Sequence, residues 1–185
     1  MKKELGGKNC LYPMPVTLVG ANVRGKPNYI TIAHVGIMDF SHLCLSMGKT
    51  HYTNEGIREN GTFSVNIPST SLVKETDYCG LVSGRKTDKS ALFTAFFGKL
   101  QTAPMIMECP LNMECRLVNT VDMPKHDVFI GKIVEGYCDE EYLVEGSVDF
   151  SRVDPIIFAM YDPFYFKLGE RFAKAWDIGK ELKSK

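Results

Sequence analysis

Short runs in which apolar and polar residues alternate recur along this chain, and they constrain the fold more than any other feature. In residues 40–47 every second residue from Leu43 to Met47 is apolar, and residues 62–67 alternate in the same way. A period of two is the pattern of a half-buried β-strand. Turn-forming residues such as those of 24–27 separate the runs. The sequence therefore predicts many short strands.

The expected elements are mostly strands with a few short helices. The predicted strands are residues 15–23, 28–37, 40–47, 62–67, 110–121, 126–138 and 142–150. The predicted helices are residues 54–60, with Thr53 as N-cap and Gly61 as stop, residues 88–97 after Thr87, and about 168–182. Residues 68–87 are expected to form a long loop. The βαβ alternation of a doubly wound sheet is missing, so we expect a closed or nearly closed β-barrel with helical decorations.

Composition narrows the class of protein. A chain of 185 residues favours a single domain, here 1–185, and its formal net charge of +0 provides no broad basic face for a nucleic acid. Any anion site must then be local. No apolar stretch approaches the roughly 20 residues of a membrane helix, and the first residues lack a signal-peptide pattern. We expect a cytoplasmic protein with no membrane partner.

The cysteines and histidines do not predict a metal site. The 6 cysteines form no CxxC pair, and the 4 histidines do not cluster at metal-ligand spacing. Several cysteines lie inside apolar runs, where a reduced thiol behaves as a small hydrophobe. We expect free, buried thiols and no bound metal.

The stretch SMGKTHYTNEGIRENGT, residues 46–62, concentrates hydrogen-bond donors where a strand leads into a helix. The first turn of a helix presents unpaired backbone N–H groups and a partial positive charge, which together favour an anion. Lys49 and His51 can add charge, and the hydroxyls of Ser46, Thr50 and Thr53 can donate to phosphate oxygens. The alternative is that Thr53 only caps the helix while the charged side chains are solvated.

A second basic loop, Ser83-Gly84-Arg85-Lys86-Thr87-Asp88-Lys89, could supply further phosphate donors. A P-loop needs glycine where Arg85 stands and a buried strand before it, so this loop does not predict a nucleoside triphosphatase. An ordinary exposed basic loop remains the alternative to a second donor cluster.

Two further features leave their roles open. His126 and Asp127 begin a predicted strand and could form an acid/base pair, but no nucleophile accompanies them, and His126 could equally be structural. Residues 161–166 gather aromatic side chains, which could pack in the core, form a subunit interface or line a planar ring system. No GxGxxG follows a strand, so a Rossmann dinucleotide site is absent.

Taken in order, several segments resemble the flavin reductase-like family of FMN-binding split barrels, and within it the flavoredoxin type. The matching segments are YPMPVTLVGA, GKPNYITIA, KTHYTNEGIRENGTFSVNIPS, DYCGLVSGRKTDKS, LNMECRL and HDVFIGKIV, with a closing aromatic segment that ends in KLGE. The resemblance covers roughly residues 11–170. It implies a mainly β fold, a Greek-key-like, FMN-binding split β-barrel with a few decorating helices.

The resemblance also implies a set of cofactor-binding residues. The residues implied along the flavin are Asn28, Thr31 and Ile32. The loop beneath the ring and ribityl chain would consist of Ser46, Met47, Gly48, Lys49 and Thr50. The phosphate would be held by His51, Thr53, Ser83 and Lys89, and the ring region would be contacted by His126 and Phe164. His34 stands where flavoredoxin-type relatives can have tryptophan, which changes the expected ring contact. Members of the family are typically homodimers with one FMN per subunit.

The implied chemistry is that of the flavin, with the protein orienting the cofactor. The leading hypothesis is an NAD(P)H:flavin oxidoreductase that passes electrons through FMN to free flavin or to a redox protein. A second is a non-enzymatic FMN electron carrier, favoured by the missing dinucleotide fingerprint. A third is a barrel that binds another phosphorylated aromatic ligand.

Overall fold

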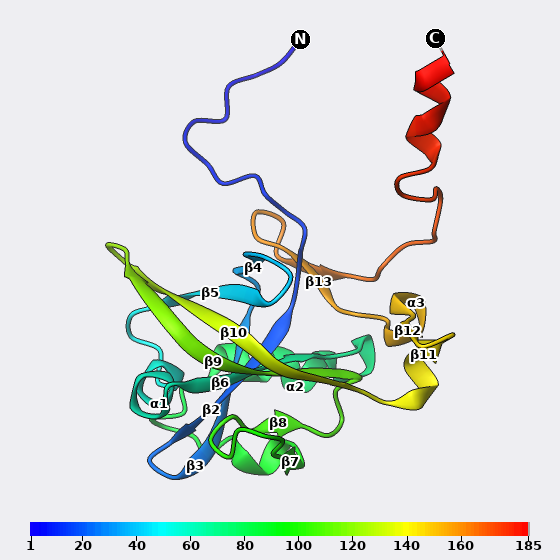
Figure 1. Ribbon diagram of the computed structural model, residues 1–185. Helices are drawn as coiled ribbons and strands as arrows, with labels where there is room; N and C mark the ends of the chain where they lie inside the picture. The colour runs from blue at the N-terminus through cyan, green and yellow to red at the C-terminus, as the bar shows by residue number, and fades with distance from the viewer. Residues whose placement is uncertain (185) are drawn as a thin grey trace.

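A seven-stranded antiparallel sheet forms the body of the molecule in the computed structural model, which describes residues 1–184. The sheet order is β3-β2-β6-β9-β10-β5-β4. Its strands are β2 (Thr17–Val23), β3 (Lys26–Ile32), β4 (Val35–Ile37), β5 (His42–Gly48), β6 (Thr62–Ile67), β9 (Leu111–Asp122) and β10 (His126–Cys138). The sheet curls into a half-barrel, with few helices around it (Figure 1). The mainly β prediction is confirmed.

The core lies inside the curled sheet. Leu45, Met47, Phe63 and Phe129 have fully buried side chains there. The alternation predicted for residues 40–47 is seen in β5, whose apolar residues point inward. Burying each such side chain contributes about 1.5–3 kcal/mol, so this face fixes the register of the strands.

Helix α1 (Thr53–Asn60) connects β5 to β6 and packs against β2. A Cβ at Gly56 would lie 2.1 Å from the carbonyl oxygen of Asn22, so glycine is what allows this close approach. Gly61 ends the helix with φ 63°, as predicted. The predicted cap is wrong: Tyr52 holds the N-cap position without a side-chain cap, and Thr53 is the first helical residue.

The prediction of a loop over residues 68–87 is wrong, because α2 (Val73–Leu81) lies within it, after a 3-10 turn at Thr70–Leu72. The only buried residues of α2 are Thr76 and Cys79, so the helix has no apolar stripe to mark it in the sequence. It packs against β3, where the Thr31 hydroxyl donates to the Thr76 carbonyl. Tertiary packing, rather than amphipathic pattern, stabilises it.

The predicted helix over residues 88–97 is also wrong. The Asp88 carboxylate accepts from the backbone N–H and the hydroxyl of Ser90, which starts only a 3-10 turn at Ser90–Leu92. The chain then pairs as β7 (Ala95–Phe96) with β8 (Met105–Ile106). Local turn chemistry and strand pairing override the helical pattern.

Two other predicted strands are divided. Residues 28–37 break between Ile32 and Val35, which places Ala33 and His34 in a link between β3 and β4. Residues 142–150 form only a hairpin of β11 (Leu143–Val144) and β12 (Ser147–Val148), between a 3-10 turn at Glu140–Tyr142 and α3 (Phe150–Val153).

A small sheet closes one end of the half-barrel. It joins β1 (Met14–Pro15), β13 (Ile157–Ala159) and β14 (Phe164–Phe166) in the order β1-β13-β14. Because β1 directly precedes β2, this small sheet places the C-terminal strands β13 and β14 next to the start of the large sheet.

The two chain ends extend away from the body on the same side (Figure 1). The predicted tail helix is wrong over most of its length, since only Ile178–Ser184 is helical, as a 3-10 helix. Phe172 and Trp176 are 98% and 95% exposed. A short helix is marginal without a surface to pack on, and here the tail has none.

All six cysteines are free thiols, of which Cys79, Cys109 and Cys115 are buried. Burial raises the pKa of the Cys79 thiol to about 11 and that of Cys115 to about 12, which keeps both protonated and unreactive. Among the described helices, none combines the length and hydropathy needed to cross a membrane.

Candidate functional site

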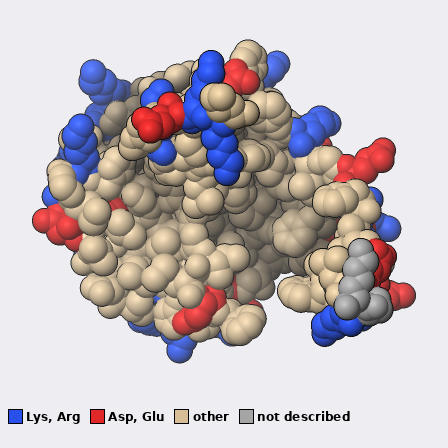
Figure 2. Space-filling model, turned by 90° about the horizontal axis from the view of Figure 1, so that it is seen from above, with Lys and Arg blue, Asp and Glu red and all other residues tan. Residues whose placement is uncertain are grey.

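A cleft of about 250 Å³, here called the central cleft, lies between the large sheet and the small one. Its lining residues are Val16, Thr31, Ile32, Ala33, His34, Ser46, Gly48, His51, Gly80, His126, Phe158, Met160 and Tyr165. Seen from above, the molecule is hollowed beside the C-terminal segment, with uncharged residues inside and both basic and acidic side chains around it (Figure 2). The register of β10 with β5 pairs His126 with Gly48, which sets two of the lining residues side by side.

A second cleft of about 260 Å³, here called the anion cleft, lies where α1 begins and α2 ends. Its lining residues are Asn28, Ile30, Thr50, His51, Tyr52, Thr53, Gly80, Leu81, Val82, Ser83, Gly84 and Lys89. His51 and Gly80 line both clefts, so the two form one elongated site.

Backbone amides at the start of α1 are available in the anion cleft. His51 N–H donates to Gly48 O, and the amides of Asn54 and Glu55 donate back to the preceding turn. Within the described chain, the amides of Thr50, Tyr52 and Thr53 donate to no other residue. Unpaired donors at a helix N-terminus favour a bound anion.

Lys89 places a buried ammonium beside these amides. The residue is 2% exposed, and its Nζ donates to the carbonyls of Cys79 at 3.2 Å and Val82 at 3.1 Å, at the end of α2. It pairs with no carboxylate of the described chain, and desolvation lowers its pKa. A buried charge without a counter-ion is costly, so an anionic ligand would stabilise it.

His51 joins the two clefts and carries a polar atom with no partner. Its Nδ1 is buried and has no hydrogen bond among the described residues. Burial lowers the pKa of the imidazole, and its neighbours His126 and Lys89 lower it further. The ring is therefore held neutral in a locally positive environment, which an anion would complement.

Thr53 contributes a hydroxyl that donates a hydrogen bond to no described residue. The residue is 1% exposed, and its Oγ1 accepts from Asn28 Nδ2 at 2.7 Å. The oxygen accepts this hydrogen bond and the O–H donates to no described residue, so the hydroxyl can donate to a ligand in the anion cleft.

Most of the residues that the sequence predicted for the site line these two clefts. In the central cleft are Thr31, Ile32, His34, Ser46, Gly48, His51 and His126, and in the anion cleft are Asn28, Thr50, His51, Thr53, Ser83 and Lys89.

Three predicted residues line neither cleft. Met47 is fully buried with its side chain in the core, because alternation along β5 turns it away from Ser46. Lys49 forms an ion pair with Asp122 at the end of β9. Phe164 is 62% exposed on β14, and its neighbour Tyr165, which pairs with Phe158, lines the central cleft instead.

The site predicted from the sequence left out Tyr52, Gly80 and Phe158, and it included Tyr165 only in the aromatic segment 161–166, whose role it left open. Gly80 lies on a helix that the sequence did not reveal, so its position was not predictable. The two aromatic residues belong to β13 and β14, where alternation could have separated the face of Tyr165 from that of Phe164.

His34 has a partner outside the central cleft. The hydroxyl of Tyr12 lies 2.6 Å from His34 Nε2, and the rings of His34 and His126 are 6.3 Å apart. His34, Ser46 and His126 also line a third cleft, of about 390 Å³, on the side of Tyr12. His34 therefore lines both clefts, and its hydrogen bond to Tyr12, a residue of the third cleft, holds its imidazole in place.

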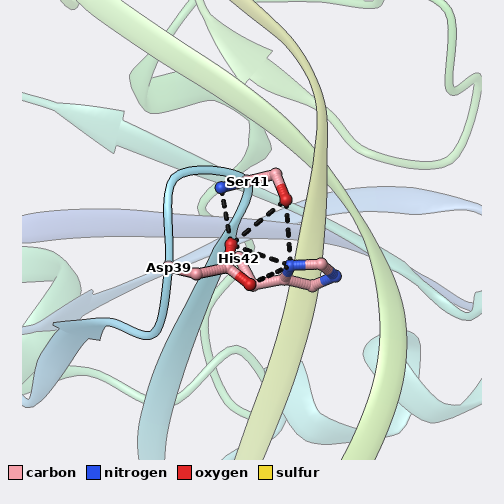
Figure 3. Close-up of polar contacts among 3 residues, drawn as sticks. All are labelled: Asp39, Ser41 and His42. Carbon is pink, nitrogen blue, oxygen red and sulfur yellow. Dashed lines mark hydrogen bonds and ion pairs between the residues drawn. The ribbon is translucent and has the colours of Figure 1, made fainter.

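Asp39, Ser41 and His42 form a polar cluster at the turn before β5 (Figure 3). Asp39 accepts from the Ser41 N–H at 2.7 Å, and His42 Nδ1 lies 2.9 Å from the same carboxylate and 3.0 Å from the Ser41 hydroxyl. A catalytic triad uses different ring nitrogens for its Asp and Ser, whereas here both partners share Nδ1. These bonds lower the pKa of Asp39 to about 2, and the cluster stabilises a turn.

No group of three or more His, Cys, Asp or Glu side chains in the described part of the chain could hold a metal ion. The two clefts offer anion donors and apolar walls.

Known proteins share this fold. Residues 9–156 match the family model described as "Flavin reductase like domain". The chain is similar to the flavoredoxin of Methanosarcina acetivorans, at 47% identity with a TM-score of 0.96, covering 98% of this chain and 99% of that one. It is also similar to the flavoredoxin of Desulfovibrio vulgaris (Miyazaki F), at 37% identity with a TM-score of 0.90, covering 97% of this chain and 100% of that one.

A curated relative, an uncharacterised protein of Archaeoglobus fulgidus, is 35% identical over 128 residues, which cover 67% of this chain and 72% of that protein. The resemblance inferred from the sequence and the split-barrel fold are both confirmed. The chain belongs to the flavin reductase-like family of split barrels.

Proposed function

We propose that this protein binds FMN, with the phosphate in the anion cleft and the ring system in the central cleft. The single observation that carries the proposal is Lys89, a buried ammonium without a carboxylate partner among the described residues, beside unpaired amides at the start of α1. The two similar structures named flavoredoxin support the same assignment.

The residues present fit the cofactor. The anion cleft supplies an ammonium, three amides and the Thr53 hydroxyl for a phosphate. His51 Nδ1, which lacks a partner in the described chain, lies where the two clefts join and can bind the phosphate or the chain next to it. The central cleft has apolar walls in Ile32 and Phe158, which suit a flat aromatic ring.

Bound FMN supplies the ability to accept and release a hydride or single electrons. The protein's own residues bind, orient and shield it. Lys89 and the α1 amides hold the anionic end, and the apolar walls exclude water from the ring. The imidazole rings of His34 and His126, 6.3 Å apart, are polar groups of the central cleft that can contact the ring system.

We propose NAD(P)H as the electron donor and free flavin or a redox protein as the acceptor. An absorption spectrum of the purified protein, followed by anaerobic addition of NADH and NADPH, tests both steps. Flavin absorbance that bleaches rapidly and saturably with one nucleotide supports the oxidoreductase. Protein that neither contains nor binds FMN contradicts the whole proposal.

The same measurement separates an electron carrier from an enzyme. The chain carries no glycine-rich dinucleotide loop, which favours a carrier that exchanges electrons only with proteins. Bound FMN that NADH and NADPH do not reduce would favour this alternative. If another phosphorylated aromatic compound displaces FMN at much lower concentration, the site serves that ligand instead.

We also infer that the protein forms homodimers. Large apolar side chains are exposed on the extended C-terminal segment, namely Leu168, Phe172, Trp176, Ile178 and Leu182. Such a concentration of exposed apolar surface is typical of an interface.

A further inference from the structure

Asn54, in the first turn of α1, is a buried polar residue that lines neither the central cleft nor the anion cleft. It is 1% exposed. Its Nδ2 donates to the carbonyl oxygen of Gly48 at 2.9 Å, across six positions of the chain. Gly48 is the last residue of β5, so this side chain bridges the loop between the strand and the helix.

The amide of Asn54 has a partner at one of its two ends only. A carbonyl oxygen can only accept, so the atom that meets Gly48 O is Nδ2, and Oδ1 faces away from it. Oδ1 is buried and has no hydrogen-bond partner among the described residues. An unpaired buried oxygen costs free energy, which an apolar side chain of similar size would avoid. Local stability therefore does not account for an asparagine here, and its contribution is the contact to Gly48.

The carbonyl of Gly48 is the point at which this loop is fixed. It also accepts from the backbone N–H of His51 at 3.0 Å, and the His51 carbonyl accepts from the backbone N–H of Asn54 at 3.2 Å. These three hydrogen bonds among Gly48, His51 and Asn54 are here called the loop clamp. Because Gly48 pairs with His126 of β10, the clamp ties the first turn of α1 to the sheet.

The loop clamp encloses the donors of the anion cleft. The unpaired amides of Thr50, Tyr52 and Thr53 all lie between its two ends. The imidazole of His51 lies against Gly48, where a Cβ would come within 3.2 Å of Nε2. Hydrogen bonds weaken steeply when distance and angle leave their optimum, so the conformation of this loop determines how well its donors meet an anion.

We propose that Asn54 is a positioning residue for the anion cleft, which acts through Gly48 and His51 to hold the loop in the conformation that presents its amides to a phosphate group. The inference rests on the proposed function for the identity of that phosphate. Asn54 lines neither cleft, so its side chain acts on the loop and not on the ligand. Its loss should weaken the phosphate contacts and spare those of the ring with Ile32 and Phe158.

The test compares the wild type with Asn54→Ala and, as a matched control, Asn60→Ala. Asn60 ends the same helix and also donates through Nδ2 to backbone carbonyls, those of Asn22 and Gly56, at 2.8 Å each. In fluorescence titrations, Asn54→Ala should bind FMN about tenfold more weakly than the wild type does, and riboflavin within about twofold. Asn60→Ala should keep the wild-type ratio of the two affinities. The wild-type ratio in Asn54→Ala would overturn the proposal, because a merely structural residue changes both affinities together.

Hydrogen exchange of the apoproteins tests the loop clamp without a ligand. The backbone amide of His51 should exchange faster in Asn54→Ala than in the wild type, and at the wild-type rate in Asn60→Ala. An unchanged rate in Asn54→Ala would overturn the proposal. A wild type that binds FMN no better than riboflavin would instead overturn the proposed function, whereas the exchange rates would still decide the clamp.

A second variant, Asn54→Leu, fills the volume that alanine leaves and undergoes the same measurements if Asn54→Ala does not fold. Neither substitution leaves Gly48 O unpaired, because the His51 N–H remains, so the fold should persist. If neither variant folds, Asn54 is a residue of the fold alone and the proposal is overturned.

Discussion

The hydroxyl oxygen of Tyr12 lies 2.6 Å from Nε2 of His34. Tyr12 belongs to the segment before β1, and His34 to the link between β3 and β4. Since His34 lines the central cleft, the N-terminal segment sets the orientation of a side chain that faces the proposed flavin site.

Replacing Tyr12 by phenylalanine should remove that hydrogen bond while keeping the aromatic packing. We expect a loss of about 0.5–1.5 kcal/mol in the free energy of unfolding, measured by urea denaturation. Tyr161→Phe is the matched control, because its hydroxyl has no hydrogen-bond partner within the described residues. Equal losses in the two variants would show that the Tyr12–His34 bond contributes nothing specific.

Replacing Lys89 by methionine should weaken the binding of FMN by about 1.5–3 kcal/mol, because it removes a charge-assisted contact to phosphate. Riboflavin lacks the phosphate, so its affinity should change little. Fluorescence titration with both flavins measures the difference directly. Lys49→Met, which removes a lysine paired with Asp122, should leave the preference for FMN over riboflavin intact. If Lys89→Met lowers the affinity for FMN and for riboflavin equally, Lys89 lies outside the phosphate site.

Replacing Thr53 by valine leaves the buried amide of Asn28 without its acceptor. We expect the apoprotein to lose about 1–3 kcal/mol of stability, whereas Thr53→Ser, which keeps the hydroxyl, should lose less. FMN should raise the Tm of Thr53→Ser as it does that of the wild type, and should raise the Tm of Thr53→Val by a smaller amount. If FMN raises all three Tm values equally, the Thr53 hydroxyl does not bind the phosphate.

The stability of the apoprotein should depend on pH through His51. Its folded pKa lies below the 6.5 of an unfolded histidine, chiefly because of burial. The unfolded state therefore takes up the proton first, so stability is retained above 6.5 and falls as pH decreases toward the folded pKa.

Thermal unfolding at about pH 7.5 and about pH 5.5 should show this loss in the wild type and a smaller one in His51→Gln. The carboxyl of Asp39, with a pKa of about 2, titrates well outside this range. A pH dependence identical in both proteins would assign the loss to other groups.

Placing charges on the exposed tail should disrupt the proposed homodimer. A Phe172→Asp, Trp176→Asp variant replaces side chains that are 98% and 95% exposed, so the fold of the subunit should persist. Light scattering after gel filtration should report a dimer for the wild type and a monomer for the variant. Met123→Asp, at the turn between β9 and β10, should remain dimeric. A monomeric wild type would exclude the dimer outright.

The sequence predicted several of the strands and the two loops that are rich in hydrogen-bond donors. The alternation in residues 40–47 and 62–67 predicted β5 and β6, and the limits predicted for residues 126–138 are those of β10. These patterns report burial of one face of a strand, which is a local property of spacing. The residue types at 46–53 and 83–89 likewise indicated a concentration of anion donors, because hydroxyl and ammonium groups are a property of residue type alone.

The tertiary structure alone decided how those donors meet. Helix α2 has no apolar stripe and forms because it packs on β3, and its last carbonyls hold the ammonium of Lys89 in the anion cleft. Alternation within β5 turned Met47 into the core, and the ion pair with Asp122 drew Lys49 away. A sequence shows which donors are present, but burial and pairing between distant segments determine which of them face a ligand.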